Sequence, residues 1–268
     1  MTFSNSLGNY FLVDDFWHFN KAAHTSWSEL AHPWTYSGED FKAYWFNEQR
    51  LSGARGQGFF RPLVTGFFKV APRWVGYEAW AYHLVSVLLH VLTSLAVGAA
   101  ARLFFQDIRV AGAVALLFAV HPSHAECIQW VAANADVAEG FFFLTGFACF
   151  GWWLRQRRLW QYAAAFGSFL LGLCTKESAV VFPAVLLVHE FYRMRCFGEG
   201  AARCLIARHA PFWLVAGAYV ILHAGVIGGV AAVNQKGIYM HDPFSITFLP
   251  FVLFNLSYEM LHLLAPVP

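Results

Sequence analysis

Residues 77–104, YEAWAYHLVSVLLHVLTSLAVGAAARLF, form the apolar stretch that decides the fold. Between Trp80 and Ala101 it contains no Asp, Glu, Lys or Arg. An α-helix needs about 20 consecutive apolar residues to cross the hydrocarbon core of a bilayer. The stretch therefore predicts a membrane-spanning helix.

Further apolar stretches follow it along the chain. We place them at residues 109–120, 137–154, 159–174, 178–192, 210–230 and 244–264. The first of these is short and ends at His121-Pro122, so it is either tilted or continues past the proline. Together they predict an all-α, polytopic membrane helix bundle over residues 77–268, with about seven spans.

The composition agrees with a chain that faces lipid. Hydrophobic residues make up 58% of the 268 residues and charged residues only 13%, whereas soluble domains carry about 25% charged residues. The 28 Phe, 11 Trp and 10 Tyr suit lipid contact and interfacial belts. The net charge of +2 does not indicate a nucleic-acid partner. The five cysteines lack metal-site spacing and are interpreted mostly as small apolar residues, with a Cys127–Cys174 bridge as an open alternative.

Residues 1–76 differ from the rest, because they contain no apolar stretch of about 20 residues. Short amphipathic pieces at Asp15–Ala23 and Glu39–Leu51 are typical of helices that lie at the membrane interface. Gly53, Gly56 and Gly58 then indicate a loop. We expect a segment outside the bilayer, and we expect both ends of the chain to be incomplete relative to a longer parent.

The loops predict the orientation. One set of turns is rich in arginine: Arg102, Arg109, Arg155, Arg157, Arg158, Arg193, Arg195, Arg203 and Arg208. The alternate turns contain only Lys176 and Lys236 as basic residues. By the positive-inside rule the arginine-rich turns are cytoplasmic, so residues 1–76 and the alternate turns lie outside.

The pair Asp14-Asp15 is the first candidate site. Two carboxylates this close raise the pKa of one of them, which suits a general base, and they could also bind a metal or a phosphate-linked sugar. The alternative is a solvated helix start, because Asp favours N-cap positions.

The turn after the second span holds His121, His124 and Glu126, followed by Asp136. These side chains could bind a metal or a phosphate, although the spacing matches no zinc-protease helix. The alternative is a polar turn between two spans. A divalent metal stays possible on this pattern, and the sequence names no metal ligand.

Three further positions carry charge or imidazole near the spans. Lys176-Glu177 could receive a phosphate, or could form a self-paired charged turn. Arg61 could bind an anionic lipid head group or could snorkel to the interface. His83 and His90 lie on one stripe of the first span and could bind substrate, or could be satisfied buried histidines.

The predicted topology places these groups on one side of the bilayer. The acidic pair, Arg61, the His121–Asp136 turn and Lys176-Glu177 all fall on the non-cytoplasmic face. Polar groups that converge from separate loops favour a shared site.

The order of these motifs resembles membrane glycosyltransferases of the type C fold. It comprises Asp-Asp, then Phe60-Arg61-Pro62-Leu63, Tyr82-His83-Leu84 with His90, His-Pro-x-His-x-Glu with Asn-Ala-Asp, and Lys-Glu-Ser-Ala followed by His189-Glu190. Over residues 8–192 the chain is similar to protein O-mannosyltransferase-like proteins that carry tetratricopeptide repeats, and to their bacterial relatives. Ser86 and Asn134 depart from the residues expected in that family.

The resemblance implies transfer of a sugar from a polyprenyl- or dolichyl-phosphate donor to a hydroxyl of a protein or glycan acceptor, with inversion. Asp14 or Asp15 would be the base. Arg61 and Lys176, helped by His121 and His124, would offset the charge on the leaving phosphate. The carboxylates Glu126, Asp136 and Glu177 would orient these groups or bind sugar hydroxyls. The membrane would be the bacterial inner membrane or the endoplasmic reticulum, with a periplasmic or luminal active face.

Two other classes of function stay open. A transporter or channel would place ionisable groups near the bilayer midplane and would show inverted repeats. The sequence shows no repeat and gathers its charges at one face, which favours an enzyme. A truncated, inactive membrane scaffold is the third hypothesis.

Overall fold

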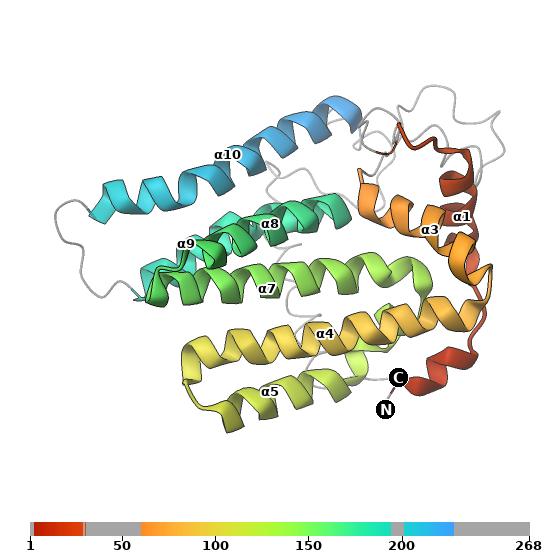
Figure 1. The fold of residues 1–268 in the computed structure, drawn as a ribbon, viewed down its shortest axis with the longest axis horizontal. Coiled ribbons are helices and arrows are strands. Elements are labelled where there is room, and N and C mark those ends of the chain that lie inside the picture. The colour runs from red at the N-terminus through yellow and green to blue at the C-terminus, as the bar shows by residue number, and fades with distance from the viewer. Residues whose placement is uncertain (1–2, 29, 31–59, 194–200, 228–268) are drawn as a thin grey trace, which may run out of the picture.

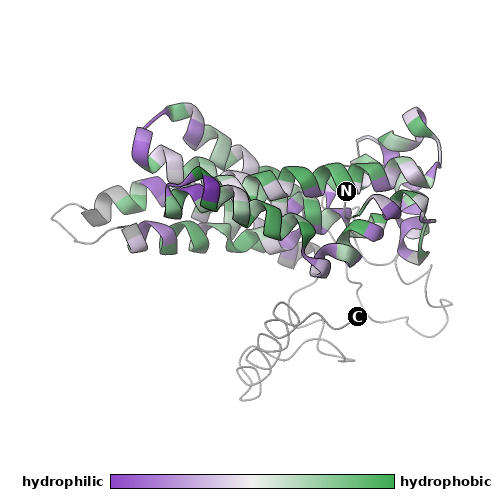
Figure 2. Ribbon diagram, turned by 90° about the horizontal axis from the view of Figure 1, so that it is seen from below, coloured by the Kyte–Doolittle hydropathy of each residue, from purple (hydrophilic) through white to green (hydrophobic). Residues whose placement is uncertain are grey.

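The computed structural model describes residues 3–28, 30, 60–193 and 201–227, and within these ranges the chain is helical without a strand. Six helices run alternately in opposite directions along one axis (Figure 1). They are α4 (Ala79–Phe105), α5 (Ile108–Val120), α7 (Asn134–Gln156), α8 (Leu159–Thr175), α9 (Phe182–Arg193) and α10 (Ala201–Ile227). Figure 2 shows hydrophobic residues along the length of the bundle and hydrophilic ones gathered toward its ends.

Three of the described helices are long and apolar enough to cross a membrane: Ala79–Phe105, Val131–Gln156 and Leu205–His223. A fourth span is present if Ile108–Val120 and Pro122–Gln129, bent by 52°, count as one broken helix. The predicted all-α membrane bundle is therefore confirmed, and the predicted number of about seven spans is not. The predicted span 244–264 lies outside the described residues.

Short helices join the long ones at one end of the bundle. Three of them follow α5: η4 (Pro122–His124), α6 (Ala125–Gln129) and η5 (Val131–Ala133). A fourth, η6 (Glu177–Val181), joins α8 to α9. The break after α5 falls at Pro122, whose ring fixes φ and which takes the first position of η4.

The N-terminal elements lie at the same end. They are η1 (Ser4–Gly8), α1 (Val13–His24) and α3 (Pro62–Val75). The predicted amphipathic helix at Asp15–Ala23 is confirmed as α1, whereas Glu39–Leu51 lies outside the described residues. Helix α3 was not predicted from the sequence. Pro62 at its first turn is a start signal, but Pro72 inside it argues against a helix on sequence grounds.

Aromatic packing fastens α1 and α3 to the start of α4. The Phe19 ring lies 5.0 Å from that of Phe68 on α3 and 5.2 Å from that of Tyr82 on α4, centroid to centroid. Lys69 donates from Nζ to the carbonyl oxygens of Ala22, at 3.0 Å, and of Thr25. These carbonyls belong to the last turn of α1, where a cation is favoured by the helix dipole. We call this end of the bundle, with α1, α3 and η6, the site end.

The bundle interior is filled by aromatic rings and small residues. Phe150, Phe169, Phe182 and Phe212 are each at most 1% exposed and belong to one cluster. Gly146 lets α7 approach α8 closely, because a Cβ there would lie 3.3 Å from the Ala165 carbonyl oxygen. Small residues at helix contacts are typical of membrane bundles.

Candidate functional site

A bidentate ion pair links α3 to η6 at the site end. Arg61, the residue before α3, donates from Nε to Oε2 of Glu177 at 3.0 Å and from Nη2 to Oε1 at 2.7 Å. Burial alone would raise the pKa of Glu177, but the hydrogen bond and positive charge of Arg61 outweigh it and hold the pKa below its usual range. The carboxylate is therefore ionised at neutral pH.

The neighbouring residue forms a second ion pair. Lys176 Nζ donates to Oδ1 of Asp136 in the first turn of α7, and the two side chains are 25% and 43% exposed. The self-paired Lys176-Glu177 turn, one of the two sequence interpretations, is therefore wrong. The two residues instead reach to different helices, because the start of η6 lies between α3 and α7.

Asp15 is a buried anchor on α1. Its side chain is 0% exposed, Oδ2 accepts the Leu12 N–H at 2.8 Å, and Oδ1 accepts the Ala132 N–H of η5 at 2.6 Å. Burial raises its pKa despite these two hydrogen bonds, and the charge of Asp14 raises it further. The carboxylate thus joins the start of α1 to the segment that precedes α7.

Asp14 occupies a different environment one residue earlier. Its side chain is half-buried, whereas that of Asp15 is fully buried. Both lie in the first turn of α1, where the helix dipole favours negative charge. Of the two predicted catalytic carboxylates, Asp14 is the one that a ligand can reach.

His18 joins this group and was missed by the sequence analysis. Its ring stacks on Phe68 of α3, with centroids 4.8 Å apart and planes at 12°. Burial, followed by the positive charges of Arg61 and Lys21, lowers its pKa to about 3, so the imidazole is neutral. His18 lies three residues after Asp15 and therefore on the same face of the helix. This spacing is the sequence feature from which its place at the site could have been predicted.

Three of the four predicted histidines form a second group at this end, between α4, α5 and η4. The ring of His124 lies 5.3 Å from that of His90, 5.9 Å from that of His121 and 4.2 Å from that of Phe118. His90 Nε2 is 3.1 Å from the Ala119 carbonyl oxygen. His121 Nδ1 is 2.7 Å from the Ser123 hydroxyl.

Two predicted residues, His83 and Glu126, take part in none of the ion pairs or ring contacts described above. His83 is 0% exposed on α4, and neither ring nitrogen has a hydrogen-bond partner in the part of the chain that is described. Glu126 is exposed on α6. The substrate-binding roles of these two residues, and of the histidine group, stay predictions.

Metal and disulfide chemistry were the other open points. Among the described residues, no group of three or more His, Cys, Asp or Glu side chains is arranged to hold a metal ion. Cys127 and Cys174 are free thiols, so the conceivable bridge between them is not formed.

An apolar groove of about 480 Å³ lies between α3 and α4. Its lining includes Pro62, Leu63, Phe67, Val70, Trp74 and Tyr82. One end is at Pro62, directly after Arg61. The groove therefore offers apolar surface next to a guanidinium, which suits an amphiphile with an anionic head.

A third charged cluster lies at the opposite end, which we call the Arg-rich end. Glu190 of α9 pairs with Arg208 at 2.5 Å and with His209 Nε2 at 2.8 Å, both on α10. Tyr162 of α8 donates its hydroxyl to the Arg208 carbonyl at 2.8 Å. The His189-Glu190 motif, which contributed to the resemblance, is therefore not part of the site end.

Sequence comparison finds relatives for a large part of the chain. It is 34% identical over 154 residues, 56% of this chain, to protein O-mannosyl-transferase tmtc2 of Xenopus laevis. It is 30% identical over 203 residues, 71% of this chain, to protein O-mannosyl-transferase TMTC2 of Homo sapiens, and 28% identical over 152 residues, 50% of this chain, to TMTC1 of Homo sapiens.

These matches confirm the resemblance to that family of membrane proteins. The chain spans only 17% to 23% of the length of these relatives. No family model and no solved structure matches the chain.

Proposed function

We propose that the chain is part of a membrane glycosyltransferase that moves mannose from a polyprenyl- or dolichyl-phosphate donor to a hydroxyl of a protein acceptor, with inversion. The observation that carries the proposal is the site end itself. Carboxylates of α1, the Arg61–Glu177 pair and the Lys176–Asp136 pair gather there from four separate segments. The names of the relatives supply the sugar and the acceptor class.

The choice of a lipid-phosphate donor rests on the neighbourhood of Arg61. A polyprenyl phosphate joins an anionic head to a long apolar chain. The apolar groove begins at Pro62, so the chain of such a donor can lie between α3 and α4 while its phosphate is near Arg61 and Lys176. Arginine and lysine are the usual phosphate-binding side chains in proteins.

Asp14 acts as the general base in this proposal. It takes the proton from the acceptor hydroxyl as that oxygen attacks the anomeric carbon from the face opposite the phosphate. The bond between the anomeric carbon and the phosphate oxygen breaks, and the electron pair leaves with the lipid phosphate. Lys176 and Arg61 offset the negative charge that develops there.

Asp15 and His18 position these groups. Asp15 holds α1 against η5 through its two N–H contacts, which fixes the direction of the adjacent Asp14 side chain. His18 stacks on Phe68 and so holds α1 against α3, which begins directly after Arg61.

The number of spans and the active face belong to the same proposal. We propose seven spans: α8, α9 and the bent pair that α5 forms with Pro122–Gln129 count as short crossings, and the seventh predicted span, 244–264, lies outside the described residues. The site end then faces the periplasm or the lumen of the endoplasmic reticulum, and residues 1–76 lie on that side. The alternation of arginine-rich and arginine-poor turns supports this orientation.

The test is a transfer assay with radiolabelled polyprenyl-phosphate mannose and a Ser/Thr-containing peptide. Asp14→Asn should lower kcat by about 10²- to 10⁴-fold, the usual contribution of a general base, and should leave the protein folded. The matched control is Asp107→Asn, which changes an exposed helix-capping aspartate at the Arg-rich end and should leave kcat unchanged. No transfer by the wild-type chain would contradict the proposed function, and full turnover in Asp14→Asn would contradict only the base assignment.

A further inference from the structure

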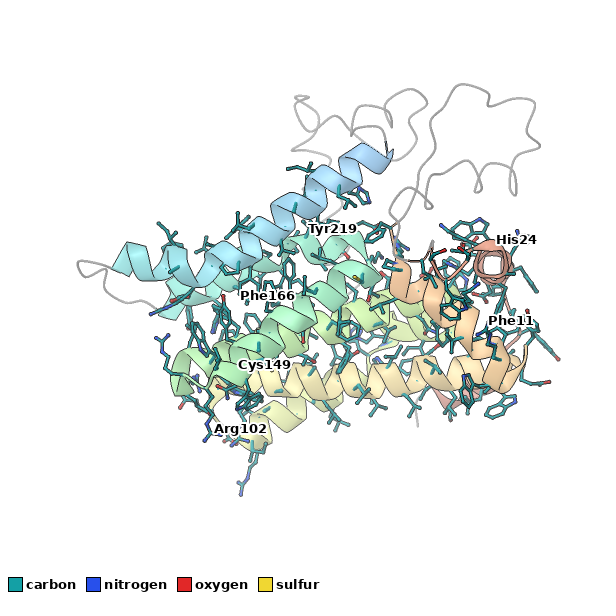
Figure 3. The ribbon with its side chains drawn as sticks, turned by 45° about the horizontal axis from the view of Figure 1, so that its top comes forward. Phe11, His24, Arg102, Cys149, Phe166 and Tyr219 are labelled. Atoms are coloured by element: carbon teal, nitrogen blue, oxygen red, sulfur yellow. The ribbon has the colours of Figure 1, made fainter. Side chains whose placement is uncertain are left out.

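The C-terminal half of α10 forms another wall of the site end. Tyr219 lies on the side of α10 that faces the bundle (Figure 3). Its ring lies 6.4 Å from that of Phe60, the residue before Arg61, and α10 also contacts η6, which begins with Glu177. One turn later His223 stacks on Tyr219 with ring centroids 5.6 Å apart. No motif in the sequence drew attention to either residue.

Both side chains keep a buried polar atom without a partner. The Tyr219 hydroxyl and His223 Nε2 are inaccessible to solvent, and neither has a hydrogen-bond partner within the residues that the structure describes. Tyr219 as a whole is 9% exposed. Buried polar groups are satisfied in most native structures, so these two atoms, one helical turn apart, leave hydrogen-bonding capacity that a ligand can use.

The charges nearby decide which ligand chemistry fits. The Tyr219 hydroxyl and the His223 ring both lie within electrostatic reach of Arg61 and of Glu177. Because Arg61 and Glu177 are paired with each other, they present no net positive charge to an anion at these two side chains. A phosphate oxygen, moreover, can only accept hydrogen bonds. A sugar hydroxyl both donates and accepts, which matches a phenol, an imidazole and a carboxylate side by side.

From this geometry we infer that Tyr219 and His223 bind hydroxyl groups of the sugar carried by the lipid donor. The inference rests on the proposed function and adds to it a sugar-binding surface on α10. The donor would then be held in three parts: its chain in the α3–α4 groove, its phosphate near Lys176 and Arg61, and its sugar against α10.

Two variants test the inference in the full chain. Tyr219→Phe removes only the hydroxyl, and His223→Leu removes the ring nitrogens while keeping an apolar side chain. Each should raise KM for polyprenyl-phosphate mannose about tenfold, the effect of one hydrogen bond of ordinary strength. Neither should lower the Tm, because the Tyr219 hydroxyl and His223 Nε2 have no hydrogen-bond partner among the described residues.

The matched control is Tyr162→Phe at the Arg-rich end. Its hydroxyl donates to the Arg208 carbonyl, so this variant should lower the Tm by a few degrees and leave KM unchanged. Sugar-free polyprenyl phosphate, used as a competitive inhibitor, separates the two parts of the donor head. Its inhibition constant should be the same in wild type, Tyr219→Phe and His223→Leu.

Three results would overturn the inference. An unchanged KM in both variants would show that α10 does not touch the donor. A parallel rise of KM and of the inhibition constant for polyprenyl phosphate would assign the contact to the phosphate. A wild-type chain that neither transfers mannose nor binds either lipid would contradict the proposed function and, with it, the sugar contact.

Discussion

Charged clusters stand at both ends of the helix bundle, and they differ in how far solvent reaches them. At the Arg-rich end Glu190 and His209 are each 3% exposed and Arg208 is 25% exposed. At the site end the exposed fractions of the paired side chains are 19% for Arg61, 32% for Glu177, 25% for Lys176 and 43% for Asp136. The carboxylate of Glu190 is therefore shielded from solvent, whereas those of Glu177 and Asp136 are partly accessible.

A buried ion pair and a partly exposed ion pair respond differently to a ligand. Removing one partner from a buried pair leaves an uncompensated charge in a low-dielectric interior, so the Glu190 cluster holds α10 against α9. A partly exposed pair can exchange one partner for a ligand group at little cost in free energy. The comparison predicts that changes at the Arg-rich end affect stability, while changes at the site end mainly affect binding and turnover.

The largest expected effect is that of Glu190→Ala. We expect it to lower the free energy of unfolding by about 3 kcal/mol, because Arg208 and His209 lose their shared carboxylate. Thermal unfolding in detergent micelles measures the change. The control is Glu126→Ala, which removes an exposed carboxylate on α6 and should change the unfolding free energy by less than about 0.5 kcal/mol. Equal losses in the two variants would remove the distinction between the ends.

A double-mutant cycle on Arg61 and Glu177 should give the next largest effect. The variants Arg61→Gln, Glu177→Gln and their combination should show a coupling free energy of about 1 kcal/mol, because the pair is bidentate but partly exposed. Unfolding in denaturant reports this coupling. A value as large as the loss in Glu190→Ala would mean that the Arg61 pair is an anchor of the same kind.

The Lys176–Asp136 pair should contribute still less to stability. Lys176→Gln should change the unfolding free energy by less than about 1 kcal/mol, since both side chains are partly exposed. The same variant should lower kcat for mannose transfer, because Lys176 faces the leaving phosphate in the proposed reaction. Unchanged turnover together with reduced stability would assign the pair to the scaffold.

The smallest expected effect is a pH dependence at Glu177. Its pKa is lowered in the folded chain, so its contribution to stability is present above its ordinary pKa near 4.5 and is lost as the pH falls through the folded value. The stability difference between wild type and Glu177→Gln should therefore shrink below about pH 4.5, from a value near 1 kcal/mol at pH 7. Denaturant unfolding of both proteins at pH 7, 5 and 4 measures this stability difference.

The contribution of Asp15 to stability should depend on pH in the opposite direction to that of Glu177. Its pKa is raised in the folded chain, so its contribution to stability is present below its ordinary pKa and decreases as the pH rises through the folded value. As the pH is lowered, the stability difference between wild type and Asp15→Asn should therefore grow, whereas that between wild type and Glu177→Gln should shrink. Parallel slopes in the two variants would contradict the assigned pKa directions.

The sequence predicted the helices and the end of the bundle at which each turn lies. The stretch 77–104 predicts α4 because membrane insertion depends on local hydropathy, and the hydropathy of about 20 consecutive residues can be calculated from the sequence alone. The alternation of arginine-rich turns placed Asp15, Arg61 and Lys176 at the same end, and the structure brings them there. Hydropathy failed at α3, where Pro72 and a short length conceal the helix.

The tertiary structure alone decided which charges meet. Lys176 and Glu177 are neighbours in the chain, yet their partners Asp136 and Arg61 lie 40 and 116 residues away, so no local pattern could assign them. Tyr219 reaches the site end only because α10 packs on η6. Hydropathy is a property of each segment, whereas ion pairing is a property of the packed bundle, and for that reason the sequence determined the helices and the fold determined the site.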